Sequence, residues 1–227
     1  MTTPASVSDQ ILAIPDGAGG VSGLGDTFAA DPYTGTGRFS VPIALPPGYA
    51  GLGPSLALVY SSGAGAGVCG VGWAFGVGSI RRRTDKGIPT YTAIDRFVLG
   101  DDELVPVGGG YFVLRTEGRF ARIRHVQNKD GDFWAVTEAN GTRKLYGRQR
   151  EDRDGDNTRI SAWHLSEIRD TSDNKVTFHH TRGEDGHRTY LTAITWAGTA
   201  YQVLLTYEDR IDVLRSARTG MVETTDP

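Results

Sequence analysis

The sequence is short of cysteine and of surplus charge of either sign. Cys69 is the single cysteine among 227 residues, which excludes an intramolecular disulfide framework and any cysteine-rich zinc site. The 24 basic and 27 acidic side chains give a formal net charge of -3, so the chain lacks the basic footprint of nucleic-acid-binding domains. We therefore expect no nucleic-acid partner.

Long hydrophobic runs are also missing. The longest apolar stretch, residues 68–80, is interrupted by glycines and falls short of the roughly 20 residues that span a bilayer. The first residues lack the basic and apolar segments of a signal peptide. We therefore expect no direct membrane span and no classical export signal.

Glycine is abundant and unevenly placed. Of the 31 glycines, 17 lie in residues 1–80, a segment that carries only five charged side chains. Such a composition suits extended backbone that packs closely against neighbouring strands. Two compositional regimes therefore meet near Arg81-Arg82-Arg83, which we interpret as a solvated strand end.

Apolar and polar residues alternate with a period of two along much of the chain, which predicts β-strands. The predicted strands cover residues 39–45, 56–60, 96–99, 111–114, 120–126, 133–137, 143–146, 163–168, 176–180, 190–196 and 201–207. Pro42 donates no ladder hydrogen bond, so we place it at an edge or a bulge. Turn signals recur about every 8–15 residues, and residues 210–219 are the one helix candidate. The prediction is an all-β fold, an antiparallel meander of about ten to thirteen strands with little helix.

Residues 65–70 match the pattern G-x-G-x-x-G. A dinucleotide site needs a helix directly after this pattern, but residues 71–80 contain three more glycines, and each costs a helix about 0.5–1 kcal/mol. We therefore interpret the stretch as a close-packed β loop and predict no cofactor.

An acidic turn carries Asp152, Asp154 and Asp156 at alternating positions, as calcium-binding loops do. An EF-hand loop requires glycine at its sixth position and glutamate at its twelfth, where this chain has Asn157 and Trp163. A solvated hairpin turn is the simpler interpretation. The three aspartates are kept as candidate calcium ligands, and no other metal site is predicted.

The sequence contains no catalytic constellation. It has no G-x-S-x-G nucleophile elbow and no histidine pair in H-x-x-x-H spacing. Trp134, Trp163 and Tyr207 are candidates for a sugar-binding platform, although aromatic residues on alternating strands belong more often to a core. We predict no catalytic residues and no enzyme; a glycosidase that uses one of the three turn aspartates is the third hypothesis.

Several stretches resemble a known family. They are GVSGLGDTFAADPYTGTG (20–37), FSVPIALPPG (39–48), GLGPSLALVYSSGAGAG (51–67), GVGWAFGVGSIRR (70–82) and RTDKGIPTY (83–91), with weaker matches at 163–170 and 209–220. These resemble the N-terminal domain shared by the Salmonella plasmid virulence protein B and the B component of insecticidal toxin complexes.

The resemblance implies a non-catalytic module of a secreted toxin, part of an Rhs-type β-sheet shell that encloses or delivers a cytotoxic partner. The implied partners are a β-propeller, the rest of the shell and a cytotoxic C-terminal region. Secretion would follow a non-classical route, from the cytoplasm. The alternative is a secreted β module that binds carbohydrate or a cell surface.

The resemblance also suggests the domain organisation. We expect an N-terminal extension over residues 1–16 and one β domain over residues 17–227. The family's β-segment continues where this chain stops, so we expect the domain to be truncated at its C-terminus.

Overall fold

The chain forms two compact units, which are described separately. The first comprises residues 1–45 and 55–76, and the second comprises residues 46–54 and 77–227. The computed structural model describes residues 36–116, 118, 120–129, 131–156, 158–208 and 213–225, and strand backbone at 22–23 and 26–30. The expected extension over residues 1–16 therefore lies outside the described residues, and the expected domain boundaries stay a prediction. None of the helices in the described part is long and apolar enough to cross a membrane.

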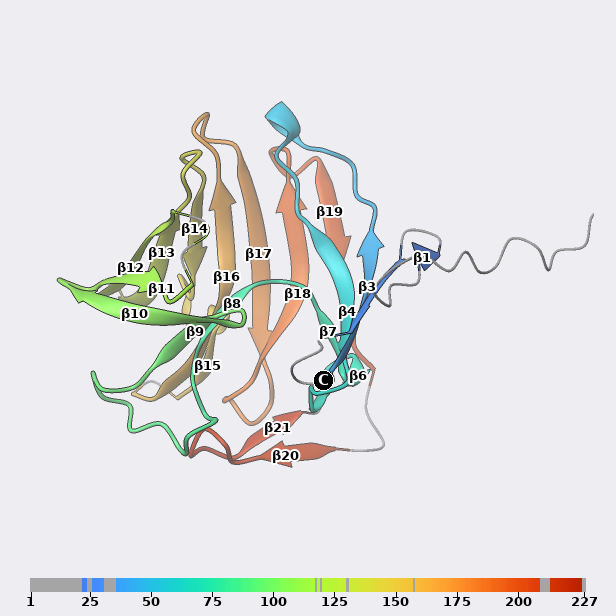
Figure 1. Cartoon of the computed structure of the whole chain (residues 1–227). Coiled ribbons are helices and arrows are strands. Elements are labelled where there is room, and N and C mark those ends of the chain that lie inside the picture. Colours follow the sequence, from blue (N-terminus) through green and yellow to red (C-terminus); the bar gives the residue numbers. More distant parts are fainter. Residues whose placement is uncertain are drawn as a thin grey trace, which may run out of the picture. The chain divides into compact units, whose positions relative to one another are not determined.

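The first unit is built on a five-stranded antiparallel sheet (Figure 1). In sheet order its strands are β1 (Ser22–Gly23), β2 (Asp26–Ala30), β3 (Gly37–Ile43), β4 (Leu56–Ser61) and β7 (Trp73–Phe75). Pro42 pairs with Ala57 of β4, while the pairing of β3 with β2 reaches only from Gly37 to Ser40. Pro42 thus lies where β3 pairs with a strand on one side only, so its missing N–H costs the sheet no hydrogen bond.

The glycine-rich stretch 65–70 is a hairpin in this unit. Strands β5 (Ala66–Gly67) and β6 (Gly70–Val71) pair with each other, and the chain continues into β7 without a helix. At Gly72, whose φ is +78°, a Cβ atom would lie 2.6 Å from the Tyr60 ring. Only glycine fits such a close approach. Within the stretch itself, a Cβ atom at Gly67 would lie 2.9 Å from the carbonyl oxygen of Trp73, while Gly65 and Gly70 have no atom within 4 Å of such a position. The β loop is confirmed, and close packing is found at Gly67 and Gly72.

Eight strands of the second unit close into a ring. In ring order they are β8 (Ser79–Arg82), β9 (Phe97–Leu99), β10 (Asp102–Gly108), β11 (Tyr111–Leu114), β12 (Arg122–Asn128), β13 (Gly131–Thr137), β14 (Arg143–Tyr146) and β16 (Ile160–Arg169). The long strand β16 completes the ring, because its residues 162–164 pair with β8 and residues 165–169 pair with β14. Closure removes the unpaired edges that β8 and β14 would otherwise present.

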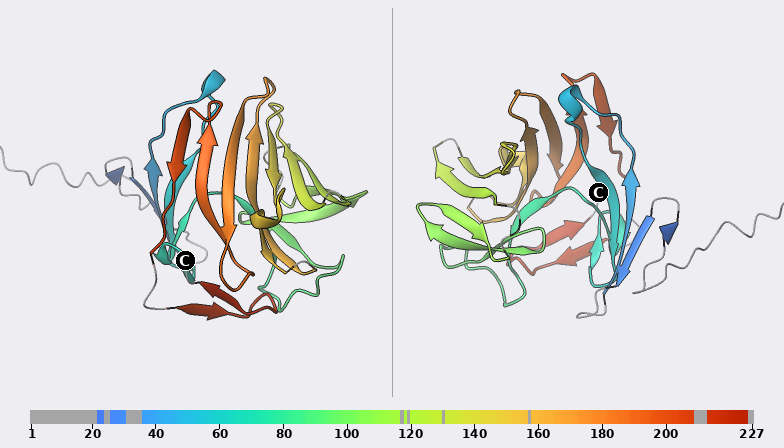
Figure 2. Two further views of the ribbon diagram at one scale, coloured as in Figure 1. Left: turned by 180° about the vertical axis from the view of Figure 1, so that it is seen from behind. Right: turned by 45° about the horizontal axis from the view of Figure 1, so that its top comes forward.

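The sheet continues beyond the ring from β16. Strands β17 (Lys175–Arg182), β18 (Thr189–Trp196) and β19 (Tyr201–Leu204) follow as antiparallel neighbours. The short strand β15 (Arg153–Gly155) also pairs with β16. A C-terminal hairpin, β20 (Leu214–Ser216) with β21 (Glu223–Thr225), runs past the β17–β18 turn, as Figure 2 shows from two further sides.

The all-β prediction is confirmed, and the described part contains 21 strand segments. The predicted number of strands was too low, because strands of two or three residues, such as β15, are too short to show an alternating pattern. The helix candidate 210–219 was wrong over its described part, since Leu214–Ser216 are paired with β21.

The core of the ring is aromatic. Phe97, Phe112, Trp134 and Trp163 lie on β9, β11, β13 and β16, every second strand around the ring, and their ring centroids are 4.9–5.9 Å apart. Side chains from alternate strands meet only across the interior. Trp134 and Trp163 are 0% exposed, so the sugar-platform interpretation of these two residues is wrong. Tyr207 is half-buried, and its hydroxyl donates to the carbonyl oxygen of Leu191.

Polar groups complete this core. Arg82 donates to Asp95 at 2.7 Å, and its guanidinium carbon lies 4.9 Å from the centre of the Phe97 ring. Asp132 accepts a hydrogen bond from Trp163 Nε1 at 2.9 Å and lies 2.7 Å from His125 Nε2. The interpretation of residues 81–83 as a solvated strand end was therefore wrong for Arg82, which is buried.

Replacing Trp163 tests how far the fold depends on this core. We expect Trp163→Ala to lower the free energy of unfolding by about 3–5 kcal/mol, because it opens a cavity and removes a donor to Asp132. Chemical denaturation followed by circular dichroism measures the loss. The control Val107→Ala, at a side chain that is 60% exposed, should change the value by less than about 0.5 kcal/mol. Equal effects of the two variants would contradict the assignment of the core.

Candidate functional site

The acidic turn folds so that its first carboxylate is buried. Asp152 ends the short 3-10 helix η3 (Arg150–Asp152) and is 3% exposed. Its Oδ1 lies 2.8 Å from His180 Nδ1, and its Oδ2 accepts from the backbone N–H of Gln149 at 2.7 Å. Burial opposes ionisation, but these hydrogen bonds outweigh it and hold the pKa of Asp152 below its ordinary value.

Asp154 forms a second carboxylate–histidine pair on the outer face of β16. Because side chains alternate along a strand, His164 points away from the core that Trp163 enters. His164 Nε2 lies 3.0 Å from Asp154 Oδ2, and the His164 and His180 rings are 5.6 Å apart. Burial lowers the pKa of His164, but the charge of Asp154 outweighs it and raises that pKa above its ordinary value. The pKa of Asp154 is correspondingly lowered.

Asp156 turns away from the other two carboxylates and closes a local turn. Its Oδ1 accepts from the backbone N–H groups of Thr158 and Arg159, and its Oδ2 accepts from Arg159 Nε at 2.9 Å. These bonds outweigh desolvation and hold the pKa of Asp156 well below its ordinary value. Among the residues that the structure describes, no three His, Cys, Asp or Glu side chains are grouped to hold a metal ion. Calcium binding by Asp152, Asp154 and Asp156 stays a prediction.

The C-terminal hairpin brings Glu223 close to the two carboxylate–histidine pairs. The Glu223 carboxylate accepts from Ser161 Oγ at 3.1 Å and from Thr219 Oγ1 at 2.9 Å. Its other oxygen lies 3.8 Å from the Arg188 guanidinium. Burial raises the pKa of Glu223 above its ordinary value. Asp152 and Asp154, His164, His180 and Glu223 thus form one ionic cluster from four separate segments.

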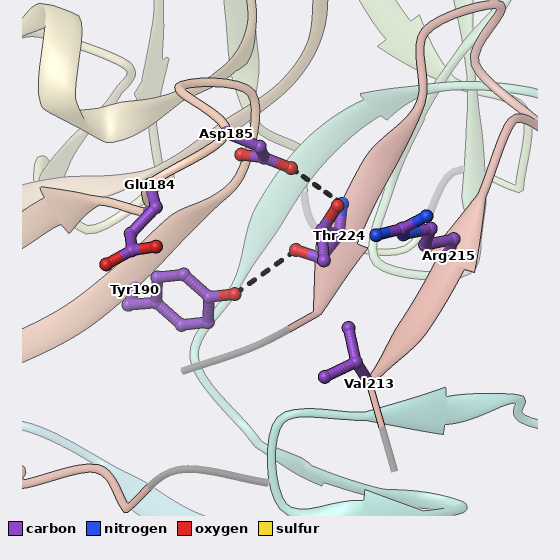
Figure 3. Close-up of a pocket in the computed structure, with 7 residues that line it drawn as sticks. Glu184, Asp185, Tyr190, Val213, Arg215 and Thr224 are labelled. Carbon is purple, nitrogen blue, oxygen red and sulfur yellow. Dashed lines mark hydrogen bonds between the residues drawn. The ribbon is translucent and has the colours of Figure 1, made fainter. Parts of the chain in front are cut away.

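A cavity of about 420 Å³ lies between this hairpin and the β17–β18 turn (Figure 3). It is lined by Gly183, Glu184, Asp185, Tyr190, Val213, Arg215 and Thr224. Thr224 closes one wall, because its N–H donates to Asp185 Oδ2 at 2.6 Å and its carbonyl accepts from the Tyr190 hydroxyl at 3.3 Å. These two hydrogen bonds attach the C-terminal hairpin to β18 and to the β17–β18 turn.

A second cavity of about 370 Å³, here called the Tyr49 pocket, lies at the opposite ends of β17 and β18. Its lining consists of Tyr49, Asp173, Asn174, Lys175, Thr177, Thr195, Trp196, Gly198 and Thr199. Sequence reasoning missed both cavities, because each is assembled from three segments that are distant along the chain. The one usable signal for the second was an isolated aromatic residue in the glycine-rich loop 46–54.

Residues 31–202 match the family described as Salmonella virulence plasmid 65kDa B protein. The chain belongs to this family. It is 36% identical to the mono(ADP-ribosyl)transferase SpvB of Salmonella typhimurium over 48% of this chain and 22% of that protein. The chain therefore spans about a fifth of the length of the curated relative, and the predicted family resemblance is confirmed.

Two solved structures share the fold. A crystal structure of TcdB2-TccC3 matches 98% of this chain and 14% of that chain, with a TM-score of 0.77 and 20% identity. The N-terminal domain of effector protein SpvB from Salmonella typhimurium strain LT2 matches over 82% of this chain and 84% of that chain, with a TM-score of 0.68 and 22% identity. At these identities the likeness concerns the fold, and it agrees with the all-β prediction.

The pair of Asp154 and His164 predicts a pH-dependent stability. Because folding raises the pKa of His164 above its unfolded value of 6.5, this histidine stabilises the fold below pH 6.5. That stabilisation is lost as the pH rises through the pKa of the folded state. The lowered pKa of Asp154 adds stability above its unfolded value of 3.8. We therefore expect Asp154→Asn to destabilise the fold by up to about 3 kcal/mol near pH 5.5, and by less near pH 9.

Urea denaturation at the two pH values measures this difference. The control Asp173→Asn removes a carboxylate that is 72% exposed and pairs with Arg169 at the surface, so it should cost less than about 1 kcal/mol. A loss for Asp154→Asn that does not depend on pH would contradict the assignment.

Proposed function

We propose that this chain is a non-catalytic structural module of a secreted bacterial toxin, which helps to enclose or deliver a cytotoxic partner domain. The observation that carries the proposal is the likeness to TcdB2 in its complex with TccC3, which extends over 98% of this chain. Family membership adds a relative that is named as an effector protein, of which the matching part is the N-terminal domain.

The three turn aspartates do not fit the glycosidase alternative. A glycosidase needs one carboxylic acid whose pKa is raised so that it can protonate the leaving oxygen. Asp152, Asp154 and Asp156 all have lowered pKa values, so this turn offers no general acid. The raised carboxyl pKa in the same cluster is that of Glu223, whose carboxylate accepts from Ser161 and Thr219.

The sheet of the second unit also suits a shell wall. Of the described strands, only β18 pairs with β19, so β19 has a backbone edge at which another strand can add. The proposed partners follow from the toxin complexes: the remaining shell, a β-propeller and a cytotoxic C-terminal region. Secretion by a non-classical route belongs to the same proposal.

A chimera tests the proposal. In TcdB2, the segment that matches this chain is replaced by residues 1–227 and the product is combined with TccC3. We expect a stable complex in which the C-terminal region of TccC3 resists added protease to the same extent as in a parallel sample with unaltered TcdB2. The matched control is the same chimera with Trp163→Ala, which should fail to assemble because its core is opened.

Two results would contradict the proposal. One is a chimera that is folded by circular dichroism but leaves TccC3 open to protease. The other is glycoside hydrolysis or ADP-ribosyl transfer by the chain alone, with loss of that activity in Asp154→Asn.

A further inference from the structure

The Tyr49 pocket lies where three turns of the second unit meet. These are the loop 46–54, the β16–β17 turn at residues 170–174 and the β18–β19 turn at residues 197–200. In Figure 1 the turns lie at the ends of β17, β18 and β19 nearest the 3-10 helix η2 (Tyr49–Gly51). None of the groups discussed for the ionic cluster lines this cavity.

The side chain of Tyr49 is exposed, while its backbone is held in a tight turn. Its side chain is 60% exposed, yet it stands in a tight turn closed by hydrogen bonds from Gly51 N to Gly48 O and from Leu52 N to Tyr49 O. The loop is also held by the Trp196 side chain, because Trp196 Nε1 donates to the carbonyl oxygen of Pro46 at 3.0 Å. The backbone that carries the exposed ring is thus ordered before a ligand arrives, which lowers the conformational entropy lost on binding.

Gly48 shows how closely this loop is seated. A Cβ atom at Gly48 would lie 2.9 Å from Trp196 Cδ1 and 2.2 Å from the carbonyl oxygen of Leu52. The loop backbone therefore rests directly on the Trp196 ring, which is 2% exposed. The backbone next to Tyr49 is therefore seated on a buried residue, and the Tyr49 ring lies near Gly198.

Backbone strain gathers at the same three turns. The described residues other than glycine include six with positive φ, and four of them belong to these turns: Ala50 (51°), Asp173 (66°), Ala197 (53°) and Thr199 (74°). For a β-branched residue such as Thr199 this conformation is a true outlier. Strain of this kind costs about 1–3 kcal/mol per residue and clusters at ligand-binding sites.

The rim of the pocket offers polar groups that the fold leaves open. Within the described part of the chain, Lys175 Nζ and the hydroxyls of Thr177 and Thr199 make no hydrogen bond. Asp173 accepts from Arg169 through Oδ1, so its Oδ2 stays open, and Asn174 donates to Asp170 through Nδ2, so its Oδ1 stays open. The lining of the pocket therefore offers both donors and acceptors beside one exposed aromatic residue.

We propose that the Tyr49 pocket binds a neutral saccharide. A pyranose ring has one face of C–H groups, which suits the Tyr49 ring, and a rim of hydroxyls, which suits Asp173, Asn174 and Lys175. The lining carries one carboxylate and one ammonium, so it favours an uncharged sugar. A cavity of about 370 Å³ lies at the lower end of the range for small-ligand sites. The inference is independent of the proposed scaffold role, and it moves sugar binding away from Trp134 and Trp163.

The experiment uses the full chain and the methyl glycosides of glucose, galactose, mannose and N-acetylglucosamine as probes. Binding is followed by ligand-detected NMR and isothermal titration calorimetry. We expect at least one probe to bind, Tyr49→Ala to weaken it at least about tenfold, and Tyr49→Phe to retain it. Lys175→Ala should weaken binding severalfold.

The matched control is Tyr111→Ala, which removes a tyrosine that is 38% exposed on β11 and should leave binding unchanged. Thermal unfolding verifies that Tyr49→Ala is folded. The proposal is overturned if the wild-type chain binds none of the four probes at millimolar concentration. It is also overturned if folded Tyr49→Ala binds as tightly as wild type.

Discussion

The closure of the eight-stranded ring by β16 is the constraint on which the second unit depends. This strand pairs through one half with β8, which lies about 80 residues earlier in the chain, and through the other half with β14. Trp163 projects from it into the core and contacts Phe97 and Trp134. The opposite face carries His164, which holds Asp154. One strand therefore positions both the aromatic core and the ionic cluster.

The charged groups of the cluster are paired within the fold. Asp152 Oδ1 lies 2.8 Å from His180 Nδ1 and Asp154 Oδ2 lies 3.0 Å from His164 Nε2, while Asp154 Oδ1 is buried without a hydrogen-bond partner among the described residues. Glu223 brings the C-terminal hairpin onto β16 through Ser161. Pairing of this kind offsets part of the cost of burying charge.

Local pattern predicted the strands well where they are long. The alternation in residues 176–180 and 190–196 corresponds to β17 and β18, and the position of Pro42 agrees with its one-sided pairing. The same reasoning failed for Arg82, since a cation beside Asp95 and an aromatic ring is stable in a core that the sequence does not reveal. For Trp134 and Trp163 the core interpretation was right and the sugar-platform alternative wrong, since both side chains are fully buried.

By itself the sequence determined the family, the all-β class and the close-packed glycine loop, because these depend on residue identity and on short periodicities. Only the tertiary structure decided that the ring closes, that Asp152 and Asp154 pair with histidines while Asp156 closes a local turn, and that Tyr49 lines one pocket with Asn174 and Lys175. Each of these requires a pairing between residues far apart in the chain. Such pairings follow from the packing of the whole unit and not from any local preference.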